Sequence, residues 1–202
     1  RLNAVGSGRA RRQHLGQQLD KLMTELAYAG TVIDQPLTMA MLAAWERHGG
    51  DRILLEDAQR QSLSWRAWFT RAFILAELLE ATCTGQRNVG LLLPNSTAAV
   101  IAFLALHLRG RTPVMLSLTA SLHDLISACR MAEVRTICTS RAAIAAADQR
   151  SLITALSTQL QVLFLEDLQP QATAWVKLRG RVWAWIPEYS FRQWAGSVRS
   201  KD

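Results

Sequence analysis

The chain has few of the residue types from which recognisable catalytic and metal sites are built. It contains only three cysteines and four histidines in 202 residues, and no two cysteines stand at C-x-x-C spacing. This pattern argues against a zinc site and against a disulfide framework. We expect Cys83, Cys129 and Cys138 to be reduced thiols in a cytosolic setting, with Cys129 and Cys138 in core positions.

Sequence signatures of nucleotide binding and nucleophilic catalysis are also missing. Neither a G-x-x-x-x-G-K-[ST] loop nor a G-x-S-x-G elbow occurs. The pair Gly6-Ser-Gly8 follows no strand and lacks a third glycine, so we interpret it as a flexible basic loop. A surface or helix-end role is favoured for the four histidines, which fall on different predicted elements: His14, His48, His107 and His123.

Negative charge is scarce, since 16 acidic residues face 23 basic ones and the formal net charge is +7. A chain this basic favours acidic partners, whether nucleic acid, anionic lipid or an acidic carrier protein. Two acidic pairs, Glu56-Asp57 and Glu166-Asp167, follow apolar runs at predicted strand ends, where α/β proteins place functional groups. Acid–base chemistry is one interpretation of these pairs, and solvated turns are the favoured one.

Long uninterrupted hydrophobic runs are absent, although one segment comes close. Residues 89–108 contain no Asp, Glu, Lys or Arg and have the hydropathy of a membrane span. Gly90 and Pro94 interrupt the run, and a strand followed by a short helix explains both breakers better. Asn95 or Ser96 can cap that helix by accepting a bond from a free backbone N–H.

Apolar periodicity predicts alternating strands and helices over most of the chain. This alternation indicates an α/β fold: a mostly parallel sheet with right-handed crossovers, flanked by helices. Thr119 and Ser121 are the candidate caps of the helix that ends near Ala132. The predicted helices lie within residues 15–30, 37–49, 68–85, 96–109, 119–132, 140–147 and 151–160, and the predicted strands within 52–56, 62–65, 89–93, 109–115, 134–139 and 162–165.

The two ends of the chain differ from this pattern. An N-terminal amphipathic helix is predicted from the spacing of Leu15, Leu19, Leu22, Met23 and Leu26. Residues 173–202 hold four of the seven tryptophans, interleaved with cations, and predict a C-terminal Trp/Arg-rich helix that Pro187 ends. Its helical wheel places Trp175, Val176, Leu178, Val182, Trp183, Trp185 and Ile186 on one half, with Lys177 and Arg181 opposite and Arg179 on the apolar side.

Such a helix suits three roles: covering a core, lying on a membrane surface, or binding nucleic acid. Trp and Arg favour the headgroup region of a bilayer. Aromatic and basic side chains can also stack bases, but no recognised nucleic-acid-binding module is present, so we expect no nucleic-acid partner. The residues expected to contact a membrane or an acidic partner are Trp175, Lys177, Arg181, Trp183, Trp185, Arg192 and Trp194.

Several short segments resemble one bacterial family, the bifunctional 2-acylglycerophosphoethanolamine acyltransferase/acyl-[acyl-carrier-protein] synthetase, whose synthetase part is an adenylate-forming enzyme. Gly8-Arg-Ala-Arg-Arg-Gln-His-Leu-Gly16 and Leu22-Met-Thr-Glu25 look like the end of its acyltransferase domain. Ser117-Leu-Thr-Ala-Ser121 departs from the family's Asn-aromatic-Thr-Ala-Gly segment. The segments similar to the synthetase part are Val89-Gly-Leu-Leu-Leu-Pro-Asn95, Gly110-Arg-Thr-Pro-Val114, Leu118-Thr-Ala120, Ala132-Glu-Val-Arg-Thr-Ile137 and Thr139-Ser-Arg-Ala142.

The resemblance implies four regions along the chain. Residues 1–30 would be the C-terminal tail of an acyltransferase-like domain, and residues 31–36 a linker. Residues 37–170 would be the N-terminal part of an AMP-binding domain, and residues 171–202 a basic Trp-rich amphipathic segment. The implied location is the cytoplasm, peripheral to the bacterial inner membrane.

The resemblance also implies an activity for the full-length parent. A synthetase of this kind activates a fatty acid with ATP and Mg²⁺ and passes the acyl group to acyl carrier protein. The acyltransferase part re-esterifies a lysophospholipid. The implied partners are the rest of the synthetase domain, acyl carrier protein, and lysophospholipid or an anionic membrane.

No catalytic, cofactor-binding or metal-binding residue can be carried over to this sequence. It contains no Ser/Thr/Gly-rich loop ending in Pro-Lys-Gly and no His-x-x-x-x-Asp motif. We therefore expect this polypeptide alone to be catalytically inactive. The alternatives are a non-catalytic membrane-surface or protein-interaction module and, less favoured, a basic nucleic-acid-binding protein.

Overall fold

The computed structural model describes residues 3–29, 36–186, 189 and 190. The chain divides into two units, residues 1–36 and residues 37–202. In the first unit the helix α1 (Asn3–Ala29) exposes its row of leucines. The expected loop at Gly6-Ser-Gly8 is wrong, because these residues lie inside α1. The alanines and arginines around them are strong helix formers and carry the helix through the two glycines.

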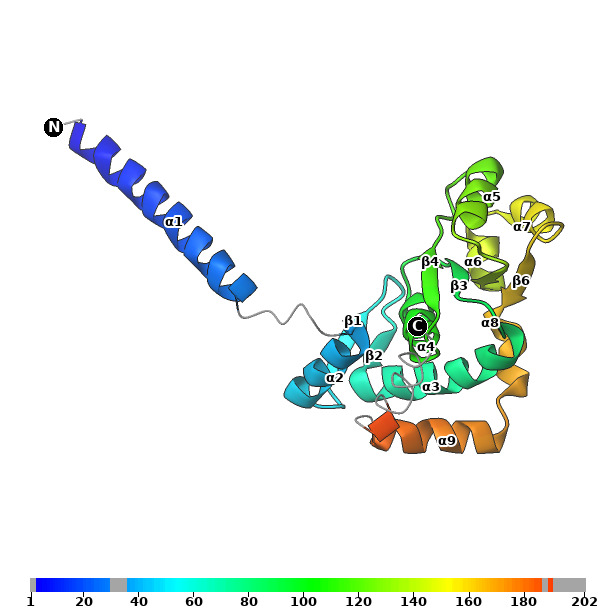
Figure 1. The fold of residues 1–202 in the computed structure, drawn as a ribbon. Coiled ribbons are helices and arrows are strands. Elements are labelled where there is room, and N and C mark those ends of the chain that lie inside the picture. The colour runs from blue at the N-terminus through cyan, green and yellow to red at the C-terminus, as the bar shows by residue number, and fades with distance from the viewer. Residues whose placement is uncertain (1–2, 30–35, 187–188, 191–202) are drawn as a thin grey trace. The chain divides into compact units, whose positions relative to one another are not determined.

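The second unit alternates strands and helices along the chain, as Figure 1 shows. The β1–β2 pair forms a separate antiparallel hairpin. The strands are β1 (Ile53–Glu56), β2 (Ser62–Ser64), β3 (Asn88–Leu92), β4 (Thr112–Met115), β5 (Thr136–Thr139) and β6 (Gln161–Phe164). The helices are α2 (Leu37–His48), α3 (Trp65–Thr82), α4 (Thr97–Leu108), α5 (Leu122–Met131), α6 (Arg141–Ala146), α7 (Arg150–Leu156), α8 (Leu165–Leu168), the short 3₁₀ helix η1 (Gln169–Gln171) and α9 (Ala174–Trp185).

The four strands β4, β3, β5 and β6 form one parallel sheet in that order. The predicted α/β class with a mostly parallel sheet flanked by helices is therefore confirmed. Gly90 in β3 stands beside Val114 of β4 and Ile137 of β5. A Cβ at Gly90 would lie 2.9 Å from Cδ1 of Leu116 and 3.1 Å from Cγ1 of Ile137, so the packing on this face requires a glycine.

Alternate residues of β3 contribute to two separate cores. Val89 and Leu91 join the large cluster formed with α3 and α4. Leu92 joins a smaller cluster formed with α5, α6 and α7. Both faces of β3 are thus buried, as its uninterrupted apolar run predicts. No helix in the described part of the chain is long and apolar enough to cross a membrane.

Side-chain caps fix where the helices begin, and the structure chooses between the candidates left open by the sequence. The Oγ of Ser96 accepts a hydrogen bond from the backbone N–H of Ala99 at the start of α4. The Oγ of Ser121 accepts one from Asp124 at the start of α5. Gly110, with φ of 64°, follows α4 and lets the chain turn into β4.

Helix α9 packs on α3 through its smallest residues. Gly180 and Ala184 are buried at this contact, and Trp183 packs partly against the large core. Arg179 forms an ion pair with Glu77 of α3 at 2.8 Å. The structure divides the apolar half predicted for α9: Trp183 faces the core, whereas Trp175 and Trp185 face outward. Arg179 lies on the apolar side because it pairs with α3.

Candidate functional site

The strand order marks one edge of the sheet as the place to look for a site. The chain runs from β3 to β4 on one side, and then returns past β3 to β5 on the other. The connections after β3 and β5 therefore leave in opposite directions. In open parallel sheets, ligands bind at the carboxyl ends of strands where this reversal occurs. We call the edge of the sheet at the carboxyl ends of β3, β5 and β6, together with the turns that follow these strands, the carboxyl edge.

Asp57 caps α4 at the carboxyl edge from a distant part of the sequence. Its Oδ2 accepts a hydrogen bond from the backbone N–H of Thr97 at 3.3 Å. Its Oδ1 accepts from the N–H groups of Gln61 at 2.9 Å and Gln59 at 3.0 Å, which closes the β1–β2 turn. These bonds, foremost the one from Gln61, lower the pKa of Asp57 from its ordinary value.

Glu166 has the same role at the neighbouring helix α6. Its Oε1 accepts hydrogen bonds from the Oγ of Ser140 and the N–H of Arg141, both at 2.8 Å. Burial alone would raise the pKa of Glu166, but these hydrogen bonds outweigh it and lower the pKa. Its Oε2 is buried and has no hydrogen-bond partner in the described part of the structure.

Asp167 turns away from this cap and pairs with Arg141. The guanidinium donates to both carboxylate oxygens, at 2.6 Å and 2.8 Å, and lies 4.3 Å from the centre of the Phe164 ring. The hydrogen bond from Arg141 holds the pKa of Asp167 below its ordinary value. Both acidic pairs singled out in the sequence thus contribute carboxylates that fix turns and helix starts.

This use of the carboxylates decides what the carboxyl edge can bind. The free N–H groups and the dipole at a helix N-terminus form a ready site for anions such as phosphate. At α4 and α6 those groups are already engaged by Asp57 and Glu166. These two helix starts therefore offer no open phosphate cradle.

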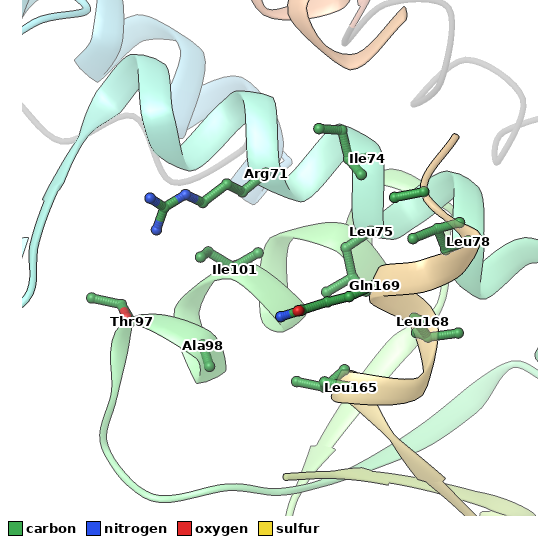
Figure 2. A pocket seen from close by; sticks show the side chains of 11 residues that line it. Arg71, Ile74, Leu75, Leu78, Thr97, Ala98, Ile101, Leu165, Leu168 and Gln169 are labelled. Atoms are coloured by element: carbon green, nitrogen blue, oxygen red, sulfur yellow. The ribbon is translucent and has the colours of Figure 1, made fainter. Parts of the chain in front are cut away.

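An apolar groove of about 420 Å³ lies between α3, the start of α4 and α8. Figure 2 shows the guanidinium of Arg71 and the side chain of Thr97 at one end, with Ile74 and Leu78 toward the other. The amide of Gln169 lies between them. The lining consists of Arg71, Ile74, Leu75, Leu78, Thr97, Ala98, Ile101, Leu165, Leu168, Gln169 and Ala172.

A second groove, of about 600 Å³, lies on the other side of α4 and reaches the carboxyl edge. It is mostly apolar, and its polar groups gather at the turns after β1 and β3. It is lined by Met41, Leu54, Leu55, Glu56, Asp57, Trp68, Asn95, Ser96, Ala99, Val100, Phe103 and Met115. The turn after β3, which has the sequence Leu93-Pro94-Asn95, thus borders a groove large enough for a small organic ligand.

The histidines and cysteines do not assemble a catalytic or metal site. In the described residues no group of three or more His, Cys, Asp or Glu side chains could hold a metal ion. Cys129 and Cys138 are buried as predicted, and Cys83 is buried too. Burial lowers the pKa of His107 at the end of α4, and its ring packs edge-on against Phe103 at 4.6 Å. His107 is therefore a packing residue that favours its neutral form.

Sequence analysis missed the structural role of Arg111. Its side chain is buried and donates to the carbonyl oxygens of Cys83 and Gln86 and to the Oε2 of Glu80. It thereby ties the end of α3 to the start of β4. An arginine directly after the helix-ending Gly110 was visible in the sequence, but nothing local indicated that it would be buried.

The residues expected to contact a membrane or an acidic partner divide into three groups. Trp175, Lys177, Arg181 and Trp185 lie on the exposed sides of α9. Trp183 is half-buried against the core, and its ring stacks on Tyr189 at 6.5 Å. Arg192 and Trp194 lie outside the described residues. Their contact with a membrane stays a prediction.

Solved structures with a similar fold include adenylate-forming enzymes and a subdomain of one of them. The N-terminal subdomain of NpsA from Klebsiella oxytoca, in complex with 3-hydroxyanthranilyl-AMSN, is 18% identical with a TM-score of 0.53, over 68% of this chain and 31% of that chain. VinN in complex with 3-methylaspartate is 17% identical with a TM-score of 0.58, over 72% and 38%. O-succinylbenzoate coenzyme A synthetase (MenE) from Bacillus subtilis, in complex with AMP, is 19% identical with a TM-score of 0.54, over 67% and 33%.

These likenesses concern the fold, and this chain spans about a third of the length of those proteins. A family model gives the assignment. The model described as AMP-binding enzyme matches residues 42–184, which is more than half of the chain and runs from α2 through α9. The chain belongs to the AMP-binding enzyme family.

Proposed function

We propose that the chain is the front part of an adenylate-forming ligase that acts on fatty acids and acyl carrier protein. In this proposal residues 1–30 are the end of a lysophospholipid acyltransferase, so the parent is a bifunctional enzyme of phospholipid reacylation. The observation that carries the proposal is the match of residues 42–184 to the AMP-binding family, together with the acyl-[acyl-carrier-protein] synthetase-like segments inside that range.

Those segments lie where a ligase would need them. Val89-Gly-Leu-Leu-Leu-Pro-Asn95 forms β3 and the turn that leads to α4. Thr139-Ser-Arg-Ala142 forms the end of β5 and the start of α6, where Glu166 accepts its hydrogen bonds. Both lie at the carboxyl edge, which is the usual position for ligands in a parallel sheet. This supports a role for the edge as one wall of the substrate site.

The phosphates of ATP require another part of the parent. Because Asp57 and Glu166 accept hydrogen bonds at the starts of α4 and α6, these two helix starts give no open anion cradle at the carboxyl edge. A Ser/Thr/Gly-rich loop with a lysine would supply one, and this sequence contains none. ATP and Mg²⁺ would therefore bind only when such a loop from the rest of the domain joins this part.

Acyl carrier protein and a lysophospholipid are the partners that the proposal implies. The formal net charge of +7 favours an acidic protein and an anionic lipid surface alike. The cytoplasmic face of a bacterial inner membrane would bring both together. Each of these partners follows from the proposed activity.

The test is an assay of the product of the complete reading frame that encodes this chain. ATP–pyrophosphate exchange is measured with a fatty acid, an aryl acid and an amino acid in parallel, and the intact mass of acyl carrier protein is measured after the reaction. We expect exchange with the fatty acid and a mass shift of one acyl group. Exchange with only the aryl acid or the amino acid would contradict the proposal.

Residues 1–202 alone serve as the matched control. We expect no exchange above background from this polypeptide, because it has no cradle for the phosphates. Exchange by residues 1–202 with a fatty acid would show that a phosphate-binding loop from the rest of the domain is not required.

Binding to DNA or RNA that falls steeply with salt would instead favour a nucleic-acid-binding protein.

A further inference from the structure

Helix α9 packs in an inverted way. Its buried residues are Gly180 and Ala184, whereas most of its large apolar side chains are exposed. A Cβ at Gly180 would overlap Cγ1 of Ile74, so α3 and α9 approach closely at this point. Burying large apolar side chains gives the most stabilisation, so a helix selected only to cover α3 would face the other way.

The exposed residues form a continuous stripe. Trp175, Leu178, Val182 and Trp185 are 65%, 50%, 53% and 78% exposed. At about 100° per residue these four lie within a sector of about 80°, opposite Gly180 and Ala184. Single exposed apolar residues are common, but an aligned row of this size marks an interaction surface.

One border of this stripe is positively charged, and the cation at the other border is neutralised in an ion pair. Arg181 and Lys177 follow one border, and both are exposed. Arg179 follows the other border, where Glu77 of α3 holds it. Helix α9 contains no Asp or Glu. Any surface that covers the stripe must therefore be apolar at the centre and tolerate or carry negative charge at its borders.

We infer that the outward face of α9 docks flat on an anionic lipid bilayer. Tryptophans at both ends of the stripe suit the interface between headgroups and acyl chains. The 12-residue helix is about 18 Å long and would lie in the plane of the surface. Lysine and arginine beside the stripe reach the anionic headgroups while their stems cover apolar surface. A bilayer also accommodates a convex ridge without a matching groove.

The inference does not rest on the proposed catalytic function. It concerns where α9 sits, and it holds whether or not the parent activates fatty acids. Adenylation assays test the carboxyl edge, and vesicle binding by variants of α9 tests the outward face of this helix. A negative adenylation assay would not contradict membrane docking by α9, and a negative vesicle experiment would not contradict the proposed ligase activity.

The experiment is cosedimentation of residues 1–202 with vesicles. One vesicle set contains phosphatidylcholine alone and the other contains phosphatidylcholine with phosphatidylglycerol. We expect binding to the anionic set, weakened by salt, and little binding to the neutral set. K177Q/R181Q should weaken anionic binding about thirtyfold, since each cation near the surface contributes a factor of about five.

A second variant tests the apolar stripe. W175S/W185S should lose binding, and circular dichroism should show an unchanged fold because both side chains are exposed. The matched control is R130Q/M131S at the end of α5, where Arg130 and Met131 are also exposed. It should bind like the wild type. Equal vesicle binding by all these variants would overturn the inference. Loss of vesicle binding only when the exposed leucines of α1 are substituted would overturn it as well.

Other occupants give distinct results. A second copy on the stripe would appear as a dimer in sedimentation equilibrium that W175S/W185S makes monomeric, without anionic-lipid binding. If the stripe binds an acidic protein instead, polyglutamate should compete with that protein for α9. Anionic vesicles should then bind the wild type and K177Q/R181Q equally well. Either result would contradict docking on a bilayer.

Discussion

Helices α3 and α9 pack against each other, and they bury opposite kinds of residues. Helix α3 buries its large side chains, among them Trp68, Phe69 and Phe73, in the main core. Helix α9 buries only Gly180 and Ala184 and leaves its large apolar side chains exposed. Apolar content therefore does not decide which face of a helix is buried. On α9 the residues that lie closest to α3 are the smallest ones.

This difference in buried residues indicates different roles: α3 supports the sheet, and α9 presents a surface. Helix α3 with α4 covers one face of the parallel sheet and so holds the carboxyl edge in shape. Helix α9 adds little apolar burial and presents a stripe bordered by cations. The match of the AMP-binding family extends through both helices, so the comparison can be tested within one domain.

The largest expected effect lies in α3. Phe73 is 1% exposed, and F73A should lower the free energy of unfolding by about 4 kcal/mol through the cavity it leaves. W185A in α9, where the side chain is 78% exposed, should change it by no more than about 0.5 kcal/mol. Urea denaturation of both variants measures the contrast. Similar losses would mean that α9 buries its large residues after all.

A smaller effect tests the close approach at Gly180. Glycine to alanine in an exposed helix stabilises by about 1 kcal/mol, but G180A should destabilise by about 1–3 kcal/mol because the new methyl overlaps Ile74. The sign of the change in unfolding free energy therefore shows whether Gly180 is exposed or packed against Ile74. G16A in α1 is the matched control, since a Cβ there meets nothing within 4 Å, and helicity should rise.

A double-mutant cycle makes this test specific. I74A removes the atom that the new methyl would strike, so G180A should cost less in the I74A background than in the wild type. The coupling between the two changes should be about 0.5–3 kcal/mol. Independent, additive effects would show that α9 does not rest on Ile74.

The pH dependence of the α4 end should be modest and of known sign. Burial holds the pKa of His107 below its ordinary 6.5, so the folded state binds fewer protons there than the unfolded state. Its contribution to stability is present above pH 6.5 and is lost as the pH falls through the lowered pKa. H107Q should therefore lose less stability than wild type between pH 7.5 and pH 5.5 in paired urea titrations. A steeper loss in H107Q would contradict a half-buried ring that favours its neutral form.

The smallest effect belongs to the ion pair between the two helices. Glu77 and Arg179 lie 2.8 Å apart, and the arginine side chain is 42% exposed. E77Q should lower the unfolding free energy by no more than about 1 kcal/mol, and less at high salt. Thermal unfolding in low and high salt checks it. A salt-independent loss would point to a packing role for Glu77.

Much of the fold could be predicted because the chain marks its elements locally. The apolar run at 91–93 followed by Pro94 predicted β3, and the β-branched residues before Thr139 predicted β5. Ser96 and Ser121 were among the candidate caps that the structure selected. These signals depend on neighbours in sequence, which is why they could be seen.

The carboxyl edge was only partly predictable. The sequence indicated that Glu56-Asp57 and Glu166-Asp167 lie at strand ends, and turns were the favoured interpretation. It could not show that Asp57 caps α4 or that Glu166 caps α6, because these bonds join residues 40 and 25 positions apart. The orientation of α9 was hidden for another reason. Gly180 and Ala184 carry little hydrophobic signal, so the helical wheel did not indicate the side that packs on α3.

Quenching of tryptophan fluorescence by brominated lipid tests the central claim about α9 most directly. Residues 1–202 are mixed with anionic vesicles whose phosphatidylcholine is brominated, and the wild type is compared with W175F/W185F. The account predicts strong quenching in the wild type and clearly weaker quenching in the variant. The other tryptophans within the described residues, Trp45, Trp65, Trp68 and Trp183, are buried or half-buried. Equal quenching in both proteins would contradict the outward face of α9 as the part that meets the bilayer.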